Sequence, residues 1–72
     1  MPNSSEFTIQ LNGEPFTISG DSHVGALIER LKLKRGRVAV EINHLVVPKA
    51  DWDTVEIQAG DKVEIVNFVG GG

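Results

Sequence analysis

One amphipathic stretch constrains the fold of this 72-residue chain more than any other feature. Its apolar residues recur at the i, i+3, i+4 and i+7 spacing of one helix face, which indicates a helix that packs on one side. The segments before and after it alternate between apolar and polar residues, as half-buried strands do. One helix and several strands must bury their apolar faces against each other, so we expect the chain to form a single α+β roll. The helical stripe consists of Val24, Leu27, Ile28 and Leu31.

The first strands are predicted to form a hairpin. Phe7–Leu11 alternates strictly, and Asn12-Gly13 follows it directly. A type I′ turn needs a positive φ angle at both central residues, and Asn-Gly accepts this conformation best. The returning strand is therefore expected over Pro15–Ser19, with Phe16 and Ile18 on its core face.

Capping residues set the expected limits of the helix. Asp21 or Ser22 can cap its first turn, because a carboxylate or hydroxyl oxygen accepts a hydrogen bond from the free N–H groups there. We expect the helix to end before Gly36, which would act as a left-handed cap, since glycine adopts a positive φ angle without steric conflict.

Four of the seven cationic side chains lie between positions 32 and 37. Such a cluster could bind phosphate or nucleic acid, but cations are also favoured at the negative end of a helix dipole. The net charge of −3 argues against a nucleic-acid partner, so we interpret the cluster as a solvated helix end. Its members are Lys32, Lys34, Arg35 and Arg37.

The two-residue alternation typical of a strand returns after the helix. Val38–Ile42 alternates and predicts a third strand, followed by a turn at Asn43-His44. Leu45–Val47 is a short strand suited to a sheet edge, because the proline at its end, Pro48, cannot donate to a ladder. A single helical turn is expected over Asp51–Asp53, whose central tryptophan covers one end of the core.

The last strand leads directly into three glycines. If Val63 and Ile65 face the helix, the residues between and after them face the uncovered side of the sheet. We expect a partner protein to dock on that side and at the start of the glycine segment. The predicted docking residues are Val66, Phe68 and Val69.

The sequence predicts a flexible tail over Val69–Gly72 and a loose leader over residues 1–5. An extended residue spans at most about 3.6 Å, so the tail could carry its carboxylate about 14 Å into another protein's active site. Gly70 and Gly71 have no Cβ and fit a narrow channel. The Gly72 carboxylate is anionic at neutral pH and able to attack the α-phosphate of ATP, so Gly72 is the expected site of modification.

No catalytic residue, metal site or bound cofactor is predicted. A chain of this size can form one core but not a deep cleft as well, so an enzyme is disfavoured. Asp21, Ser22 and His23 have the side chains of a hydrolase triad, but neighbours in sequence cannot orient one another as a triad requires. His23 and His44 are far apart in a chain without cysteine, which gives no metal-ligand spacing.

Targeting segments give a further expectation. The first six residues lack a basic region and an apolar region, and no apolar run approaches about 18 residues. We therefore expect a cytoplasmic protein with no membrane or nucleic-acid partner.

Several fragments of the chain, taken in order, resemble the ThiS sulfur carrier proteins of thiamin biosynthesis. Their order and spacing, together with the terminal glycines, are specific, although each fragment is weak alone. The resemblance spans Phe7–Gly72, and the departures at His23 and His44 do not touch the tail. The fragments are Val38–Asn43, Val47–Lys49 with Trp52, Gly60–Val66 and Phe68–Gly72.

The resemblance implies a ubiquitin-like β-grasp fold, in which a mixed sheet of four to five strands packs on one helix and the last strand lies centrally, parallel to the first. It also implies that a ThiF-like adenylating enzyme uses ATP-Mg to activate the carboxylate of Gly72. Sulfur derived from a cysteine desulfurase would then give a thiocarboxylate at Gly72, with Gly71 as the second residue of the diglycine. Thiazole synthase would take this sulfur for the thiazole ring of thiamin.

Three other readings stay open at this point. A small subunit of molybdopterin synthase shares the fold and the diglycine end. A ubiquitin-like modifier joined to protein lysines needs the same adenylate. A purely structural adaptor domain would not need a free C-terminus.

Overall fold

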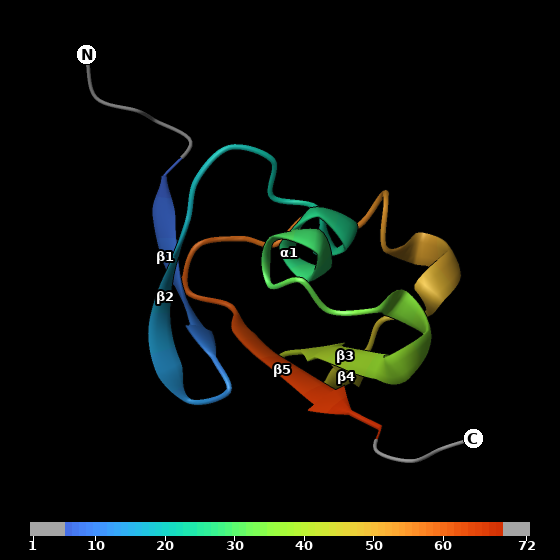
Figure 1. The fold of residues 1–72 in the computed structure, drawn as a ribbon. Coiled ribbons are helices and arrows are strands. Elements are labelled where there is room, and N and C mark those ends of the chain that lie inside the picture. The colour runs from blue at the N-terminus through green and yellow to red at the C-terminus, as the bar shows by residue number, and fades with distance from the viewer. Residues whose placement is uncertain (1–5, 69–72) are drawn as a thin grey trace.

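A computed structural model of the chain describes residues 6–68 (Figure 1). It contains one α-helix, two 3-10 helices (η) and five strands over this range. The sheet has the order β2-β1-β5-β3-β4, with β1 and β5 parallel and the other neighbours antiparallel. The elements are β1 (Phe7–Leu11), β2 (Glu14–Ile18), α1 (Val24–Arg30), η1 (Arg35–Arg37), β3 (Val38–Ile42), β4 (Leu45–Val46), η2 (Lys49–Asp51) and β5 (Lys62–Asn67).

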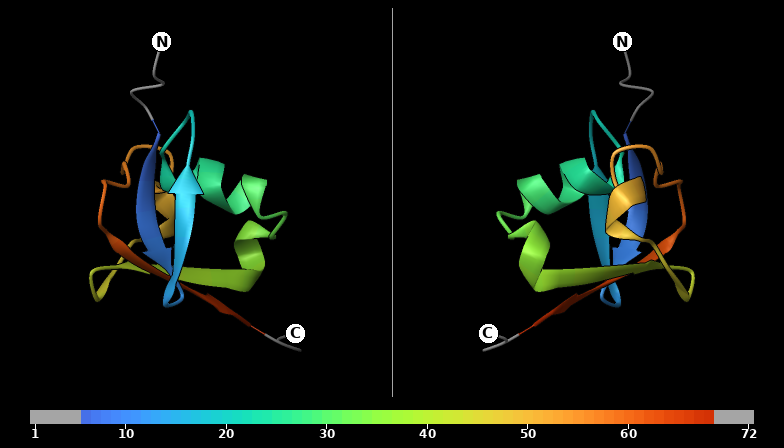
Figure 2. Two further views of the ribbon diagram at one scale, coloured as in Figure 1. Left: turned by 90° about the vertical axis from the view of Figure 1, so that its left-hand side faces the viewer. Right: turned by 90° about the vertical axis from the view of Figure 1, so that its right-hand side faces the viewer.

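This architecture confirms the expected α+β fold with a mixed sheet on one helix. The last strand, β5, lies in the middle of the sheet between β1 and β3. The sheet curls around α1, so one of its faces is covered by the helix and the other is not (Figures 1 and 2). In the described part of the chain, no helix is long and apolar enough to cross a membrane.

Both predicted tight turns are present. Asn12 and Gly13 have φ angles of 52° and 87°, and Asn43 and His44 have φ angles of 52° and 72°. Positive φ at both central residues twists the chain as the flanking antiparallel strands require. The returning strand β2 begins at Glu14, one residue earlier than predicted.

Ten apolar side chains form the core between the sheet and α1. Trp52 is fully buried, and its indole N–H donates a hydrogen bond to the carbonyl oxygen of Val47 at 2.9 Å. The polar edge of this large ring is therefore satisfied while its apolar body fills the core. The core residues are Ile9, Ile18, Val24, Leu27, Ile28, Val38, Val40, Trp52, Ile57 and Val63.

The expected capping of α1 by Asp21 or Ser22 is wrong. The N-cap is His23, and it makes no side-chain capping bond. The first N–H groups of the helix instead donate to backbone carbonyls of the segment after η2: Val24 to Val55 at 3.1 Å, and Gly25 to Trp52 at 2.9 Å. Because these carbonyls bind the N–H groups of the first two helical residues, those donors are not free for a capping side chain.

The expected left-handed cap at Gly36 is also wrong. The helix ends at Arg30, and the left-handed residue is Lys32, with a φ angle of 60°. The N–H of Lys32 donates to the carbonyl of Glu29 at 3.0 Å, and the N–H of Leu33 donates to Ile28 at 3.1 Å. These two bonds close the helix in a Schellman motif, so the chain has turned away before it reaches the glycine.

The remaining expectations concern the short helical turn and the two ends of the chain. The short helical turn is η2, which covers Lys49–Asp51 and lies two residues before the predicted Asp51–Asp53, with Trp52 directly after it. The predicted loose leader over residues 1–5 and the predicted flexible tail over Val69–Gly72 lie outside the described residues.

Candidate functional site

The strand that precedes the tail is held firmly on its β1 side. The N–H groups of Gln10 and Asn12 donate to the carbonyls of Asp61 and Val63, both at 2.9 Å. The side-chain oxygen of Asn12 then accepts the N–H of Ile65 at 2.8 Å. The turn residue Asn12 thus extends the contact with β5 beyond the end of β1.

On its other side, β5 pairs with β3 along the whole length of β3, from Ile42 opposite Val63 to Val38 opposite Asn67. One further bond lies beyond this ladder, because the N–H of Phe68 donates to the carbonyl of Arg37 at 2.6 Å. The backbone is therefore anchored up to Phe68, directly before the predicted tail. Figure 1 shows β5 leading from the centre of the sheet to the C-terminal end.

The predicted alternation along β5 is confirmed. Val63 is fully buried and Ile65 is half-buried against the core. Val66 and Phe68 are 53% and 46% exposed and belong to the opposite side of the strand. Two of the three predicted docking residues thus form an exposed apolar pair next to the tail.

Two other exposed apolar side chains were not predicted from the sequence. Leu45 and Val46 on the edge strand β4 are 72% and 66% exposed. Val46 pairs with Glu41, so it shares the uncovered side of the sheet with Val66, whereas Leu45 pairs with Ile42 on the other side. The short length of the predicted edge strand could have indicated this exposure, because a strand of so few residues has little contact with the core. We call Val46, Val66 and Phe68 the apolar face.

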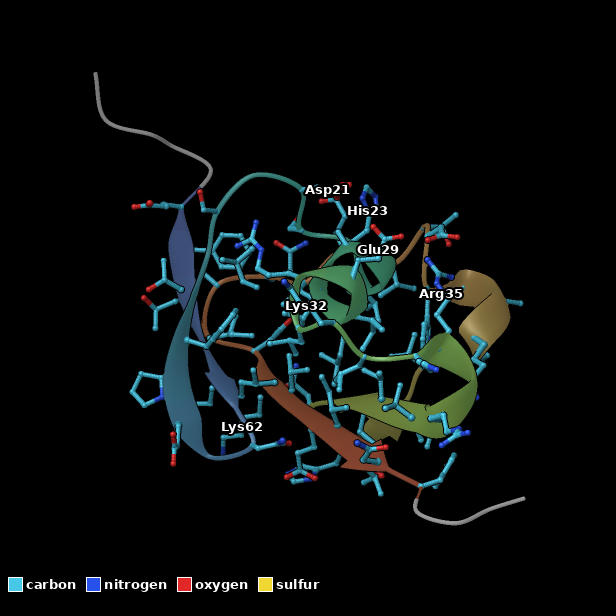
Figure 3. All side chains as sticks on the ribbon, in the orientation of Figure 1. Asp21, His23, Glu29, Lys32, Arg35 and Lys62 are labelled. Atoms are coloured by element: carbon cyan, nitrogen blue, oxygen red, sulfur yellow. The ribbon has the colours of Figure 1, made fainter. Side chains whose placement is uncertain are left out.

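A second feature lies across the molecule, beside the start of α1 (Figure 3). Asp21 bonds to the ring Nδ1 of His23 at 2.6 Å and accepts its backbone N–H at 3.0 Å. The other ring nitrogen of His23 is 3.6 Å from a carboxylate oxygen of Glu56. The hydrogen bond to Asp21, helped by the charges of Asp21 and Glu56, raises the pKa of His23 above its ordinary value of 6.5.

The same region contains an ion pair between Arg35 and Asp53, with Nη2 and Oδ1 2.7 Å apart. The hydrogen bond from Arg35 lowers the pKa of Asp53 below its ordinary value of 3.8. The guanidinium also lies over the ring of Trp52, 5.7 Å from its centroid. These contacts fasten η1 to the segment that follows η2.

Asp21, His23, Arg35 and Asp53 line an open hollow of about 340 Å³, but they do not form a hydrolase site. Both ring nitrogens of His23 face carboxylates, not the hydroxyl of Ser22, so the ring is not placed to activate that hydroxyl. Within residues 6–68, no group of three His, Cys, Asp or Glu side chains is arranged to hold a metal ion. The contacts instead connect segments that are distant in sequence.

The structure therefore describes only some of the predicted site residues. Val66 and Phe68 lie together at the end of β5. Val69, Gly70, Gly71 and Gly72 lie outside the described residues, so the predictions for the third docking residue and for the modified carboxylate remain predictions.

Comparison with protein families and solved structures adds independent information. The model of the ThiS family matches residues 9–72 of this chain. The crystal structure of the thiamine biosynthesis protein ThiS from Geobacter metallireducens has a TM-score of 0.77 and 33% sequence identity, and the match covers 92% of this chain and 100% of that chain. A solution structure of a thiamine biosynthesis protein from the same organism has a TM-score of 0.73.

Similar sequences occur both in proteins of about the same length and as part of longer proteins. The uncharacterized protein ycf40 of Porphyra purpurea is 38% identical over 69 residues, which cover 96% of this chain and 97% of that protein. A thiazole synthase of Paramagnetospirillum magneticum is 44% identical over 62 residues, which cover 86% of this chain. The match spans only 19% of that thiazole synthase, so most of that protein has no counterpart here.

Proposed function

Because this chain belongs to the ThiS family, we propose that it is the sulfur carrier of thiamine biosynthesis, with the carboxylate of Gly72 as the group that carries sulfur. The family match extends to the last residue, so it includes the three glycines whose chemistry the function needs. This is the observation that carries the proposal. The chain is then a carrier and co-substrate, and partner enzymes catalyse the reactions.

The proposed chemistry has two steps. A carboxylate oxygen of Gly72 attacks the α-phosphorus of ATP, pyrophosphate leaves, and the product is an acyl-adenylate. The AMP group makes the carbonyl carbon electrophilic. A sulfide-level sulfur nucleophile then attacks that carbon, AMP leaves with the former carboxylate oxygen, and a thiocarboxylate remains. The ThiF-like adenylating enzyme supplies the ATP-Mg site for the first step.

The fold supports this role by presenting the tail from a fixed point. Hydrogen bonds to Asn12 and Arg37 hold β5 and the following Phe68, so the residue directly before the predicted tail has a defined position in the domain. Holding a reactive group in a defined position replaces a bimolecular search by a much faster encounter. The apolar face beside this point offers a surface on which a partner could dock and align the tail.

Thiazole synthase is the proposed acceptor of the sulfur. The segment similar to this chain forms part of proteins named thiazole synthase in Paramagnetospirillum magneticum and Magnetococcus marinus. Two activities in one polypeptide commonly act in sequence, since the covalent link raises their effective concentration. This similarity supports a partnership between a carrier domain such as this one and a separate thiazole synthase.

The test is a reconstitution with the cognate adenylating enzyme, ATP-Mg and sodium sulfide, followed by intact mass measurement. Sulfide as the donor removes the need for a desulfurase and a reductant. The expected result is a mass gain equal to the exchange of one oxygen for one sulfur. A variant that lacks Gly71 and Gly72 should stay at its own unmodified mass.

The shortened variant also needs a folding control. It removes no described core side chain, so its melting temperature should remain within a few degrees of that of the full chain. Unchanged mass of the full-length protein under these conditions would reject the carrier function. Sulfur uptake by the shortened variant would reject Gly72 as the modified residue.

A further inference from the structure

Three cations gather where β5 ends. The side chains of Lys32, Lys34 and Arg37 line a shallow hollow of about 190 Å³ together with Leu33 and Asn67. Asn67 is the last residue of β5, and the carbonyl of Arg37 holds the N–H of Phe68. Figure 2 shows the end of α1, η1 and the end of β5 at the same end of the molecule. We call Lys32, Lys34 and Arg37 the basic cluster.

The basic cluster carries charge that the described part of the chain does not neutralise. Its three side chains are exposed, and none of them is within ion-pair distance of a carboxylate in residues 6–68. The neighbouring cation Arg35 differs, because it is paired with Asp53 at 2.7 Å. The four cations interpreted above as one solvated helix end therefore differ: Arg35 is in an ion pair, and, among the described residues, the three members of the basic cluster are not.

The backbone fixes the positions from which these side chains extend. Lys32 has a positive φ angle of 60° at the end of the Schellman motif, a conformation that glycine adopts with less steric conflict. The N–H of Arg37 donates to the carbonyl of Lys34 at 2.9 Å and closes η1. A lysine where glycine would be the easier choice places an additional charge beside the end of β5.

The uncovered side of β3 and β5 is charged at one end and apolar near the end of β5. Glu41 and Glu64 are paired directly across the two strands, and they lie on the side opposite the buried Val63. Val66 and Ala39 form the next pair on that side. By the same alternation Lys62 also lies on that side, so along β5 the uncovered side changes from charged residues to the apolar Val66. The basic cluster lies beyond it, where the strand ends.

Exposed cations without an ion-pair partner in the described part of the chain, next to the apolar end of β5, favour a protein partner over a polyanion. A polyanion such as RNA would meet the Glu41–Glu64 pair and a chain with a net charge of −3, both of which repel phosphate. A protein surface can instead complement both features, with carboxylates facing the basic cluster and apolar side chains facing Val66 and Phe68. Complementary charge fixes the orientation of two surfaces and speeds their association.

We propose that the basic cluster docks against carboxylates on the enzyme that adenylates Gly72, at the mouth of the site that receives the tail. This inference rests on the proposed function and adds the electrostatic character and orientation of the encounter. The cluster acts in docking and not in chemistry, because its charges project from the folded domain and not from the tail.

The test uses full-length protein in a pyrophosphate-exchange assay with the adenylating enzyme. The double charge reversal Lys34→Glu with Arg37→Glu should raise the KM for this protein on the order of tenfold or more, because steering fields change association rates by about 10 to 10³. The kcat should stay near that of the native protein. Lys32→Gly should raise the KM less, since it removes one charge and keeps the backbone conformation.

The control is Lys62→Glu, which reverses one charge at the other end of β5 and is compared with the single reversal Arg37→Glu as well as with the double variant. Its KM should remain within about twofold of the native value, because exposed charges farther apart than a Debye length of about 10 Å at 0.1 M salt are largely screened. Raising the salt concentration should bring the KM of the native protein toward that of the double variant. Circular dichroism melts confirm that all variants are folded.

Several outcomes would overturn the inference. Equal KM values for the double variant and Lys62→Glu would show that the cluster does not dock. A loss of kcat at unchanged KM would place the cluster in the chemical step. Saturable binding of ATP or an RNA oligonucleotide to the protein alone, lost in the double variant, would assign the cluster to a phosphate ligand. Absence of exchange with the native protein rejects the proposed function itself, whereas native exchange with unaffected variants rejects only the docking inference.

Discussion

The N–H of Gly25 donates a hydrogen bond to the carbonyl oxygen of Trp52 at 2.9 Å. This bond attaches the first turn of α1 to the fully buried Trp52, which directly follows η2. It also brings Gly25 under the ion pair of Arg35 and Asp53, where a Cβ atom would meet both Nη2 of Arg35 and Oδ1 of Asp53. The missing side chain at position 25 therefore makes room for the contact between η1 and the segment after η2.

Gly25→Ala should displace the ion pair with little net change in stability. Replacing glycine by alanine in a helix gains up to about 1 kcal/mol. Losing an ion pair that is 40% and 71% exposed removes a comparable or smaller amount in the opposite direction, because solvent screens exposed charges. We expect a change of less than about 1 kcal/mol in urea unfolding. A double-mutant cycle with Asp53→Asn should show coupling, because Gly25→Ala has already removed the contact. Strict additivity would contradict this account.

Core packing gives a second prediction. Ile28 is fully buried, so Ile28→Ala should lower the free energy of unfolding by about 2–5 kcal/mol, a large share of a small domain's total. Leu31 belongs to the same helical stripe but is the half-buried C-cap of α1, so Leu31→Ala should have a clearly smaller effect. Chemical denaturation of both variants measures the difference. Equal losses would show that burial in the structure does not rank these positions.

Local patterns in the sequence predicted the strands, both tight turns and the face of each strand. These features depend on neighbours, since period two sets the side of a strand and Asn12-Gly13 or Asn43-His44 sets a turn. The central place of β5 came from the family resemblance. Pairing between β1 and β5 joins residues about fifty positions apart, such as Gln10 and Lys62, and no local pattern encodes it.

Two of the errors share a physical cause, which is contact between segments distant in sequence. The helix start was assigned to a side-chain cap because the carbonyls of Trp52 and Val55, which take that role, come from a distant segment. The ion pair of Arg35 with Asp53 spans 18 residues and was missed for the same reason. The exposure of Val66 and Phe68 was predicted correctly, because the alternation that sets it is local, and their docking role stays a prediction.

The third prediction concerns pH. The pKa of His23 is raised by its hydrogen bond to Asp21 and by the nearby charges of Asp21, Glu56 and Asp53. A raised pKa in the folded state stabilises the protein below the unfolded pKa of about 6.5, and this contribution is lost as pH rises through the folded value. The pKa of Asp21 is lowered, first by the backbone N–H of His23, so its own contribution is lost only in acid.

The measurement compares melting temperatures of native protein and His23→Gln between roughly pH 5.5 and pH 8.5. The native protein should exceed the variant most at the acidic end of this range, and the difference should shrink as pH rises. A difference that is constant across the range would show that the His23 ring contributes by packing and not by charge.

The fourth prediction concerns docking through the apolar face. Phe68→Asp should weaken binding to the adenylating enzyme and to thiazole synthase by about tenfold or more, as loss of a buried aromatic anchor commonly does. The side chain is 46% exposed in the free protein, so the domain should remain folded. Leu45→Asp is the matched control, because it adds the same charge at an exposed apolar residue on the other side of the sheet. Unchanged affinity of Phe68→Asp for both enzymes would reject the docking role.

The fifth prediction separates the charge of the C-terminus from its position. Adding one alanine after Gly72 keeps a carboxylate of nearly the same pKa but moves it outward by about 3.5 Å and places a methyl group beside the carbon to be attacked. Near-attack geometry tolerates displacements of only about 1 Å before rates fall on the order of 10²-fold. Pyrophosphate exchange should therefore collapse in the extended protein.

Binding of the extended protein should largely survive, because Val66, Phe68 and the basic cluster lie on the folded domain and are unchanged. A titration against the adenylating enzyme measures this affinity separately from the rate. Loss of rate with retained affinity would assign recognition to the domain and reactivity to the last residue. Exchange as fast as that of the native protein would mean that the enzyme does not require the carboxylate at the position of Gly72, and the carrier proposal would then lose its chemical basis.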